Sequence, residues 1–147
     1  MSELADLYQE IILDHNKRPR NFREIAGCTC RAEGHNPLCG DEIEVFVQLD
    51  GERLSDVAFR GQGCAISRAS ASMMTTKAKG RTGEEAKELS RAVRGMLLGP
   101  EEEPPAALGD LAALSGVRKF PARIKCAMLP WRALEAALGG QAEATTE

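Results

Sequence analysis

The chain has 147 residues, of which 43% are hydrophobic and 28% are charged, and its formal net charge is −3. These values suit a globular protein and give no electrostatic reason to expect nucleic acid or an anionic membrane as a partner. No apolar run approaches the roughly 18 residues that span a bilayer, and the acidic start at residues 1–6 lacks the basic residues of a signal peptide. We therefore expect a cytoplasmic protein.

The first half of the chain predicts one helix followed by a small sheet. Residues 2–16 carry apolar side chains at the spacing of one helical face. Residues 27–33 indicate a short strand. Residues 43–49 alternate between apolar and polar side chains, and Asp50-Gly51 then favours a tight hairpin to a partner strand at 53–60. We expect an antiparallel sheet with one face packed and one face free.

Helical patterns dominate the second half. Gly61-Gln62-Gly63-Cys64 is a tight turn from strand to helix, and the helix is expected to run from Cys64 to about Lys79. Thr82-Gly83-Glu84-Glu85 is a capping box that opens a second helix, which ends at Gly99-Pro100. The apolar face of this helix is formed by Ala86, Leu89, Val93, Met96 and Leu97.

The last part of the chain predicts a loop, a short helical turn and a final helix. Residues 99–106 are acidic and rich in proline, which predicts an exposed loop. Because proline deep inside a helix causes a kink, Pro130 favours a helix start or a bend close to Cys126. We expect a single domain over residues 1–140 and a disordered tail at 141–147.

Five cysteines without an export signal argue for reduced thiols and against a disulfide framework. Cys39 and Cys64 lie beside glycines in turn-forming sequence, where a simple buried apolar residue is not expected. Cys28 and Cys30 fit the alternative interpretation, in which cysteine is a small buried hydrophobic residue.

Three of the cysteines, Cys39, Cys64 and Cys126, combine with Asp41 into a complete tetrahedral ligand set for a thiophilic metal. The chain has no C-x-x-C pair, so the spacing alone leaves a metal site and buried cysteines equally open. Three thiolates and a carboxylate should hold a metal less firmly than four thiolates, which suits a site that accepts and releases cargo. His35 is a further candidate ligand; the alternative is a loop histidine bonded to the backbone.

Three motifs, in this order, resemble the IscU-type iron–sulfur cluster scaffold family. They are Gly34-His35-Asn36-Pro37-Leu38-Cys39-Gly40-Asp41, Gly61-Gln62-Gly63-Cys64 and Arg123-Ile124-Lys125-Cys126. The match extends over residues 4–138. The resemblance implies an α+β fold with a small three-stranded antiparallel sheet packed against several helices, and a near-surface site made by the three cysteines. It also implies a pyridoxal-phosphate cysteine desulfurase as sulfur donor, with apo iron–sulfur proteins or carriers as recipients.

Two departures from the scaffold pattern point to the SufU branch of this family. Lys125 stands where the IscU scaffold proper has a histidine, and the stretch between Cys64 and Cys126 is longer than in that form. SufU-type proteins are similar to the IscU scaffold but often hold zinc, through three cysteines and the aspartate. The proline-rich chaperone-binding motif is not recognisable at residues 120–123.

Two functions remain open from the sequence. The first is a cluster assembly protein, a scaffold rather than a conventional enzyme, that accepts sulfur and assembles or transfers a [2Fe–2S] cluster. The alternative is a zinc-dependent sulfurtransferase that relays persulfide and never holds a cluster. A purely structural zinc is a third interpretation.

In either function the expected ligands are Cys39, Asp41, Cys64 and Cys126. Cys126 is the expected sulfur acceptor, because the charge of Lys125 favours its thiolate and a nearby helix start would leave it close to solvent. Asp41 is expected to be the most easily exchanged ligand, since it is an oxygen donor among thiolates.

Overall fold

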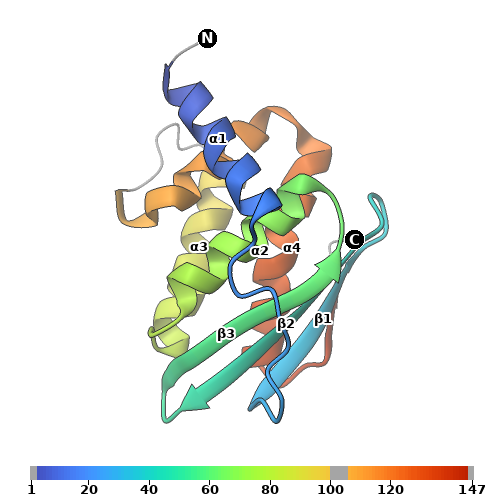
Figure 1. The fold of residues 1–147 in the computed structure, drawn as a ribbon, viewed down its shortest axis with the longest axis vertical. Coiled ribbons are helices and arrows are strands. Elements are labelled where there is room, and N and C mark those ends of the chain that lie inside the picture. Colours follow the sequence, from blue (N-terminus) through green and yellow to red (C-terminus); the bar gives the residue numbers. More distant parts are fainter. Residues whose placement is uncertain (1–2, 100–105, 146–147) are drawn as a thin grey trace.

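The computed structural model describes residues 3–99 and 106–145. It contains α1 (Glu3–Lys17), β1 (Cys30–Asn36), β2 (Asp41–Asp50), β3 (Arg53–Gln62), α2 (Ala65–Ala78), α3 (Gly83–Leu98), the 3₁₀-helical segment η1 (Ala106–Lys119), α4 (Pro121–Leu138) and β4 (Glu143–Thr145). Figure 1 shows the sheet as one layer, with α2, α3 and α4 gathered against one side of it.

The sheet has four strands in the order β3-β2-β1-β4. β1, β2 and β3 pair antiparallel, as the hairpin signals predict, whereas β4 runs parallel to β1. The α+β class is therefore confirmed, but the expected three-stranded antiparallel sheet is wrong in its strand number and in being purely antiparallel. Part of the tail expected to be disordered at 141–147 forms β4.

Both edges of the sheet are covered by chain from outside the hairpins. The amide of Arg23 donates to the carbonyl of Phe59 and the amide of Phe59 donates to the carbonyl of Asn21, both at 3.0 Å, which protects the edge of β3. β4 occupies the corresponding edge of β1 over Glu33–His35. These contacts shorten the row of unpaired backbone groups that each edge offers to another chain.

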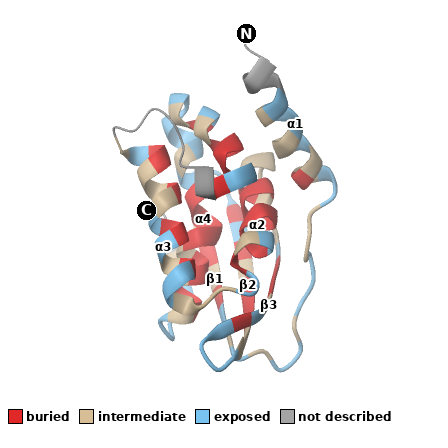
Figure 2. Cartoon of the chain, turned by 90° about the vertical axis from the view of Figure 1, so that its left-hand side faces the viewer, coloured by how far each residue is buried: buried red, intermediate tan, exposed pale blue. Residues whose placement is uncertain are grey.

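The core lies between the sheet and the helices. Ile43, Val45 and Val47 of β2 are fully buried on the inner face, as their alternation predicts. Figure 2 shows buried residues concentrated on α2, α4 and the strands they cover. The outward-facing Phe46 is also buried and lines a pocket with residues 24–31. The expectation of one free face therefore holds only in part: the segment after α1 covers Phe46, whereas Glu42 and Arg60 on the same face are exposed.

The helices begin where the sequence signals place them, with one exception. The capping box at Thr82 and Glu85 is present at the start of α3, and all five predicted apolar residues of α3 are buried. α4 begins at Pro121 and contains Pro130 in its interior, so the first expected alternative, a helix start close to Cys126, is wrong. The second alternative, a bend close to Cys126, stays a prediction. Pro130 is itself buried, and packing of α4 against neighbouring elements offsets the one backbone hydrogen bond that proline removes.

Some boundaries differ in smaller ways. The strand expected at 27–33 instead begins at Cys30 and continues to Asn36. The acidic loop expected at 99–106 falls almost wholly outside the described residues. Within residues 3–99 and 106–145, none of the helices combines the length and apolar character needed to cross a membrane.

Candidate metal centre

The candidate ligands come together at one end of the sheet, where the chain turns from β1 into β2. Asn36, the last residue of β1, pairs with Asp41, the first residue of β2. The amides of Cys39 and Gly40 donate to the Asn36 carbonyl at 3.3 and 2.8 Å. This tight turn, at the upper right of the sheet in Figure 1, carries Cys39 on its exposed side.

Cys64 enters the same region from the end of β3. It is the N-cap residue of α2, and its amide donates to Asp41 Oδ1 at 2.8 Å. Gly63 must be small, because a Cβ at this position would lie 2.5 Å from Asp41 Oδ1 and 2.6 Å from Ser67 Oγ. The glycine therefore allows the buried Asp41 carboxylate to approach the start of α2, where exposed backbone N–H groups favour negative charge.

Cys126 reaches the site from α4. Its sulfur lies 3.3 Å from the sulfur of Cys39 and 3.4 Å from Asn36 Nδ2. Asn36 Nδ2 also lies 3.3 Å from Asp41 Oδ2. Cys126 is fully buried and follows the first residue of α4 by more than one helical turn. Both positional reasons for expecting Cys126 to be the sulfur acceptor, a helix start and proximity to solvent, are therefore wrong.

Three of the four expected ligands already have the spacing of a single-ion site. The ligand atoms of Cys39, Asp41 and Cys126 all lie within 4.8 Å of one another. Two thiolates on one zinc ion can be at most about 4.6 Å apart, because each Zn–S bond is about 2.3 Å long. The sulfur of Cys64 lies 3.9 Å from Asp41 Oδ2 but does not belong to this compact group.

A buried and unpaired oxygen supports a polar occupant at this position. Asn36 Oδ1 is buried without a hydrogen-bond partner among the described residues, although buried polar atoms are ordinarily paired. Two thiols, a carboxylate and this amide face one another with no described cation inside the group. The donor set therefore fits a bound metal, which would neutralise thiolates that burial otherwise disfavours.

The surroundings of the centre shift the pKa of the buried Cys126 thiol and that of a nearby cation. Burial raises the pKa of the Cys126 thiol, and hydrogen bonds with Asp41 and with the thiols of Cys39 and Cys64 raise it further. The nearby cation is the exposed Arg123. A hydrogen bond with Cys126 and the charges of the three thiolates raise the pKa of its guanidinium. Lys125, the expected cation, is exposed, and adjacent helix positions point about 100° apart.

The part of the chain that carries the metal centre is shared with known proteins. The family model described as the NifU-like N-terminal domain matches residues 7–127. The chain belongs to this family. The matched range contains all four candidate ligands of the metal centre, so the family and the site are carried by the same part of the chain.

Relatives within the NifU-like family have two kinds of name. The chain is 46% identical, over 91% of its length and 90% of the relative's, to the zinc-dependent sulfurtransferase SufU of Bacillus subtilis. It is 41% identical, over 98% of its length and 90% of the relative's, to the iron–sulfur cluster assembly scaffold protein IscU of Streptococcus pyogenes.

Solved structures agree with the family assignment. A putative iron–sulfur cluster assembly scaffold protein for the SUF system from Fervidobacterium islandicum superposes with a TM-score of 0.84 at 37% identity. That comparison covers 94% of this chain and 99% of the solved one. The resemblance to the IscU and SufU scaffold family drawn from the three motifs is thereby confirmed.

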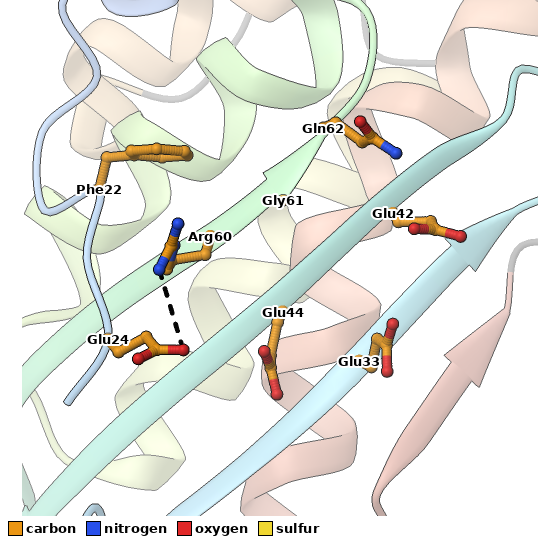
Figure 3. A pocket seen from close by; sticks show the side chains of 8 residues that line it. All are labelled: Phe22, Glu24, Glu33, Glu42, Glu44, Arg60, Gly61 and Gln62. Carbon is orange, nitrogen blue, oxygen red and sulfur yellow. Dashed lines mark ion pairs between the residues drawn. The ribbon is translucent and has the colours of Figure 1, made fainter. Parts of the chain in front are cut away.

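Other candidate residues lie apart from the centre. His35 faces Glu33 and Glu42, with nitrogen–oxygen distances of 3.8 and 4.0 Å. Cys28 and Cys30 lie at the opposite end of β1. A hollow of about 370 Å³ is lined mainly by Glu24, Glu33, Glu42 and Glu44 with Arg60 (Figure 3). None of these residues belongs to the compact ligand group.

Sequence reasoning did not assign roles to Asn36 and Arg123. Asn36 is part of the motif that carries Cys39, but an amide is a weak signal without its contacts. Arg123 precedes Cys126 by three residues, the spacing of neighbours on one helical face. Expecting the helix to start near Cys126 concealed this relation.

Proposed function

We propose that this NifU-like family member accepts sulfur from a cysteine desulfurase at the metal centre and delivers it to iron–sulfur cluster assembly. The observation that supports this most directly is the compact group of Cys39, Asp41 and Cys126, of which Cys39 is the most accessible to solvent. A buried ligand set with one accessible thiol suits a site that must meet a partner's sulfur and retain its metal.

Cys39 is the thiol best placed to react. Its thiolate would attack the outer sulfur of the desulfurase persulfide, forming a new S–S bond on Cys39 as the original S–S bond breaks. The electron pair of the broken bond leaves on the desulfurase cysteine as a thiolate, so that no external oxidant or reductant is needed. Cys126, the acceptor expected from sequence, is buried and would have to move before it could react.

The remaining residues would hold and orient the centre. Asp41, Cys64 and Cys126 would retain the metal when Cys39 engages the incoming sulfur, and Asn36 would position Asp41 and Cys126 through its amide. Bound zinc would act as a Lewis acid that keeps its thiol ligands deprotonated near neutral pH. Asp41, as the oxygen donor, would be the ligand that exchanges most readily.

Assembly of a [2Fe–2S] cluster on this chain is the second candidate function. The position of Cys64 favours it, because this sulfur lies outside the compact group and could serve a unit larger than one ion. The compact spacing of the other ligands favours sulfur transfer on a single zinc. Metal and acid-labile sulfide analysis of protein purified without oxygen separates the two: zinc without sulfide supports sulfur transfer, and iron with equimolar sulfide supports the scaffold.

A surface beside the centre is suited to a protein partner. Leu38, next to Cys39, is 66% exposed, and Phe120, at the start of α4, is 61% exposed. Large exposed apolar side chains beside a reactive group are typical of interaction sites. We propose that the desulfurase docks here, that apo iron–sulfur proteins or carriers receive the product, and that the five free thiols work in the reducing cytoplasm.

The acceptor can be identified by mass spectrometry after incubation with desulfurase and cysteine. We expect persulfide on Cys39 of the unaltered protein, and its loss in Cys39→Ser while desulfurase binding persists. Cys28→Ser is the matched control, because Cys28 lies outside the centre and should leave uptake unchanged. Persulfide on Cys126 with Cys39 unmodified would instead support the acceptor expected from sequence, and no persulfide on any cysteine would contradict sulfur transfer altogether.

A further inference from the structure

Cys28 and Cys30 form a second group of thiols that the proposed function does not use. Cys30 begins β1 and Asn36 ends it, so a rise of about 3.3 Å per residue separates this group from the metal centre by roughly 20 Å. Both cysteines are free and partly exposed. They are therefore open to a ligand of their own.

The backbone around this pair is held in place at three points. Gly27 has a positive φ of 69°, which glycine adopts without strain. The amide of Cys28 donates to the carbonyl of Ile25 at 3.3 Å. The Thr29 hydroxyl, between the two cysteines, accepts the amide of Leu49 at 2.9 Å. A segment fixed to the neighbouring strand in this way presents its thiols with little freedom to separate.

The two thiols share one pocket and lie close enough to affect each other. The pocket has a volume of about 460 Å³ and includes both cysteines in its lining. Its walls are completed by Ile25, Ala26 and Phe46, which are apolar, and by Glu24 and Arg31. Burial raises the pKa of the Cys30 thiol, and the charge of Cys28 raises it further.

We propose that Cys28 and Cys30 form a thiolate site for a soft monovalent cation, Cu(I). Soft thiolate ligands suit Cu(I), as they also suit zinc and iron–sulfur clusters. Within the described part of the chain, neither cysteine belongs to a group of three or more metal-ligating side chains. Zinc needs four ligands in a structural site, whereas the two sulfurs offered here suit an ion that accepts low coordination.

The geometry and charge of the pair agree with this assignment. Cys28 and Cys30 stand on either side of the bend at Thr29 that leads into β1, and both line the same pocket. Two sulfurs on opposite sides of one ion lie about 4–5 Å apart. Each thiol releases one proton to solvent on binding, which leaves two thiolates and Cu(I) with a net charge of −1. The pocket lining contains Arg31 as a positive charge and Glu24 as a negative one, and Arg31 Nε also lies 3.8 Å from Glu44 Oε2.

The test uses the full chain with Cys39, Cys64 and Cys126 replaced by serine, so that only the proposed site retains thiols. Cu(I) is supplied without oxygen from a coloured competing chelator, and native mass spectrometry counts bound ions. We expect one Cu(I) per monomer. Adding Cys28→Ser or Cys30→Ser should weaken binding at least about 100-fold, because two linked ligands gain this much over one. If either added serine changed the Cu(I) affinity by less than threefold, or if Cu(I) bridged two chains, the proposal would be overturned.

A second measurement protects the test against loss of folding in the triple variant. In the five-cysteine protein, the double variant Cys28→Ser with Cys30→Ser should bind one fewer Cu(I) per chain at unchanged circular dichroism. Thr29→Val, which removes the acceptor for the Leu49 amide, should weaken binding, and Thr29→Ser, which keeps it, should not. Unchanged capacity in the double variant would also overturn the site.

Discussion

Arg123 shows how a single position on a helix determines which cation influences a reactive thiol. Its guanidinium is coupled to the sulfurs of the centre, first of all by a hydrogen bond with Cys126. Arg123 and Lys125 are both exposed, but residues three apart are neighbours on a helix surface, whereas adjacent positions point about 100° apart. The positive charge that assists thiolate formation should therefore come from Arg123.

We expect Arg123→Ala to slow alkylation of Cys39 and Cys64 in metal-free protein near pH 7 by about two- to fivefold, the scale of an exposed charge pair. Lys125→Ala is the matched control and should leave the rates unchanged. The rates are measured by site-resolved mass spectrometry after timed reaction with iodoacetamide. Equal effects of the two substitutions would show that only the overall charge of this surface matters.

His15 is a buried titratable residue with a structural role. Its Nδ1 lies 2.7 Å from the hydroxyl of Ser72, which accepts the amide of Arg20 at 2.8 Å and so has its own proton available for a neutral imidazole. Burial lowers the pKa of His15, and the charge of Arg20 lowers it further, against the opposing charges of Asp110 and Asp14.

This lowered pKa predicts a loss of stability in mild acid. The unfolded chain binds a proton at His15 near its ordinary pKa of 6.5, above the folded pKa, so protonation favours the unfolded state as pH falls through that interval. The melting temperature of metal-free protein should fall between about pH 7.5 and pH 5, and His15→Gln should reduce this dependence. Identical pH profiles for the two proteins would assign the change to other groups.

At the scale of elements, the start of α3 is fixed by its capping box. Thr82 Oγ1 accepts the amide of Glu85 at 3.1 Å, and the amide of Thr82 donates to Glu85 Oε1 at 2.9 Å. We expect Thr82→Ala to cost about 1 kcal/mol of unfolding free energy, which corresponds to a melting temperature lower by roughly 2–4 °C. Thr82→Ser keeps the acceptor and should restore most of it. A loss shared by the serine variant would implicate packing of the methyl group.

Hydrogen bonds join α2 to the turn of α4 that follows Cys126. Ser70 Oγ donates to the carbonyl of Ala127 at 2.6 Å and accepts Trp131 Nε1 at 3.2 Å. Pro130 has no amide proton, so the carbonyl of Cys126 lacks its usual partner four residues on. The buried bonds of Ser70 hold the helix beside this gap.

The sequence predicted correctly those turns and helix starts that depend only on neighbouring residues. The hairpin at Asp50-Gly51 and the capping box at Thr82 depend on neighbouring residues, and both appear where the sequence places them. β4 was not predictable, because Glu143–Thr145 is short, has no alternating pattern and depends on the edge of β1 as its partner. Pro130 led to a wrong prediction of the start of α4, because tertiary packing tolerates a proline inside a helix that an isolated helix would not tolerate.

At the scale of the whole molecule, the core does not depend on the metal centre. Its buried apolar side chains come from the inner face of the sheet and from α2, α3, η1 and α4, whereas the candidate ligands gather at one end of the sheet. From chemistry and family resemblance the sequence predicted one site for Cys39, Asp41, Cys64 and Cys126, and the ligand atoms of all but Cys64 lie within 4.8 Å of one another. It could not reveal that Cys126 is buried and Cys39 exposed, because that follows from the docking of α4.

This separation predicts how metal removal acts. A metal bound at 100 times its dissociation constant adds about 2.7 kcal/mol of stability, so chelation should lower the melting temperature by roughly 5–10 °C in a protein of this size. Far-ultraviolet circular dichroism should keep its helical signal. Complete loss of that signal on chelation would favour the structural-zinc interpretation, and an unchanged melting temperature would argue that no metal is bound.

The pairing of β4 with β1 also has a mechanical consequence. β4 pairs with Glu33–His35 of β1. The next residue along β1 is Asn36, whose side-chain amide contacts Asp41 and Cys126. Tension applied at the C-terminal end would therefore be transmitted through one strand almost directly to the metal centre. Figure 1 places the start of α1 far from the sheet. Surface immobilisation and fused handles should accordingly be attached at the N-terminal end, where a pull would load α1 rather than the strand that leads into Asn36.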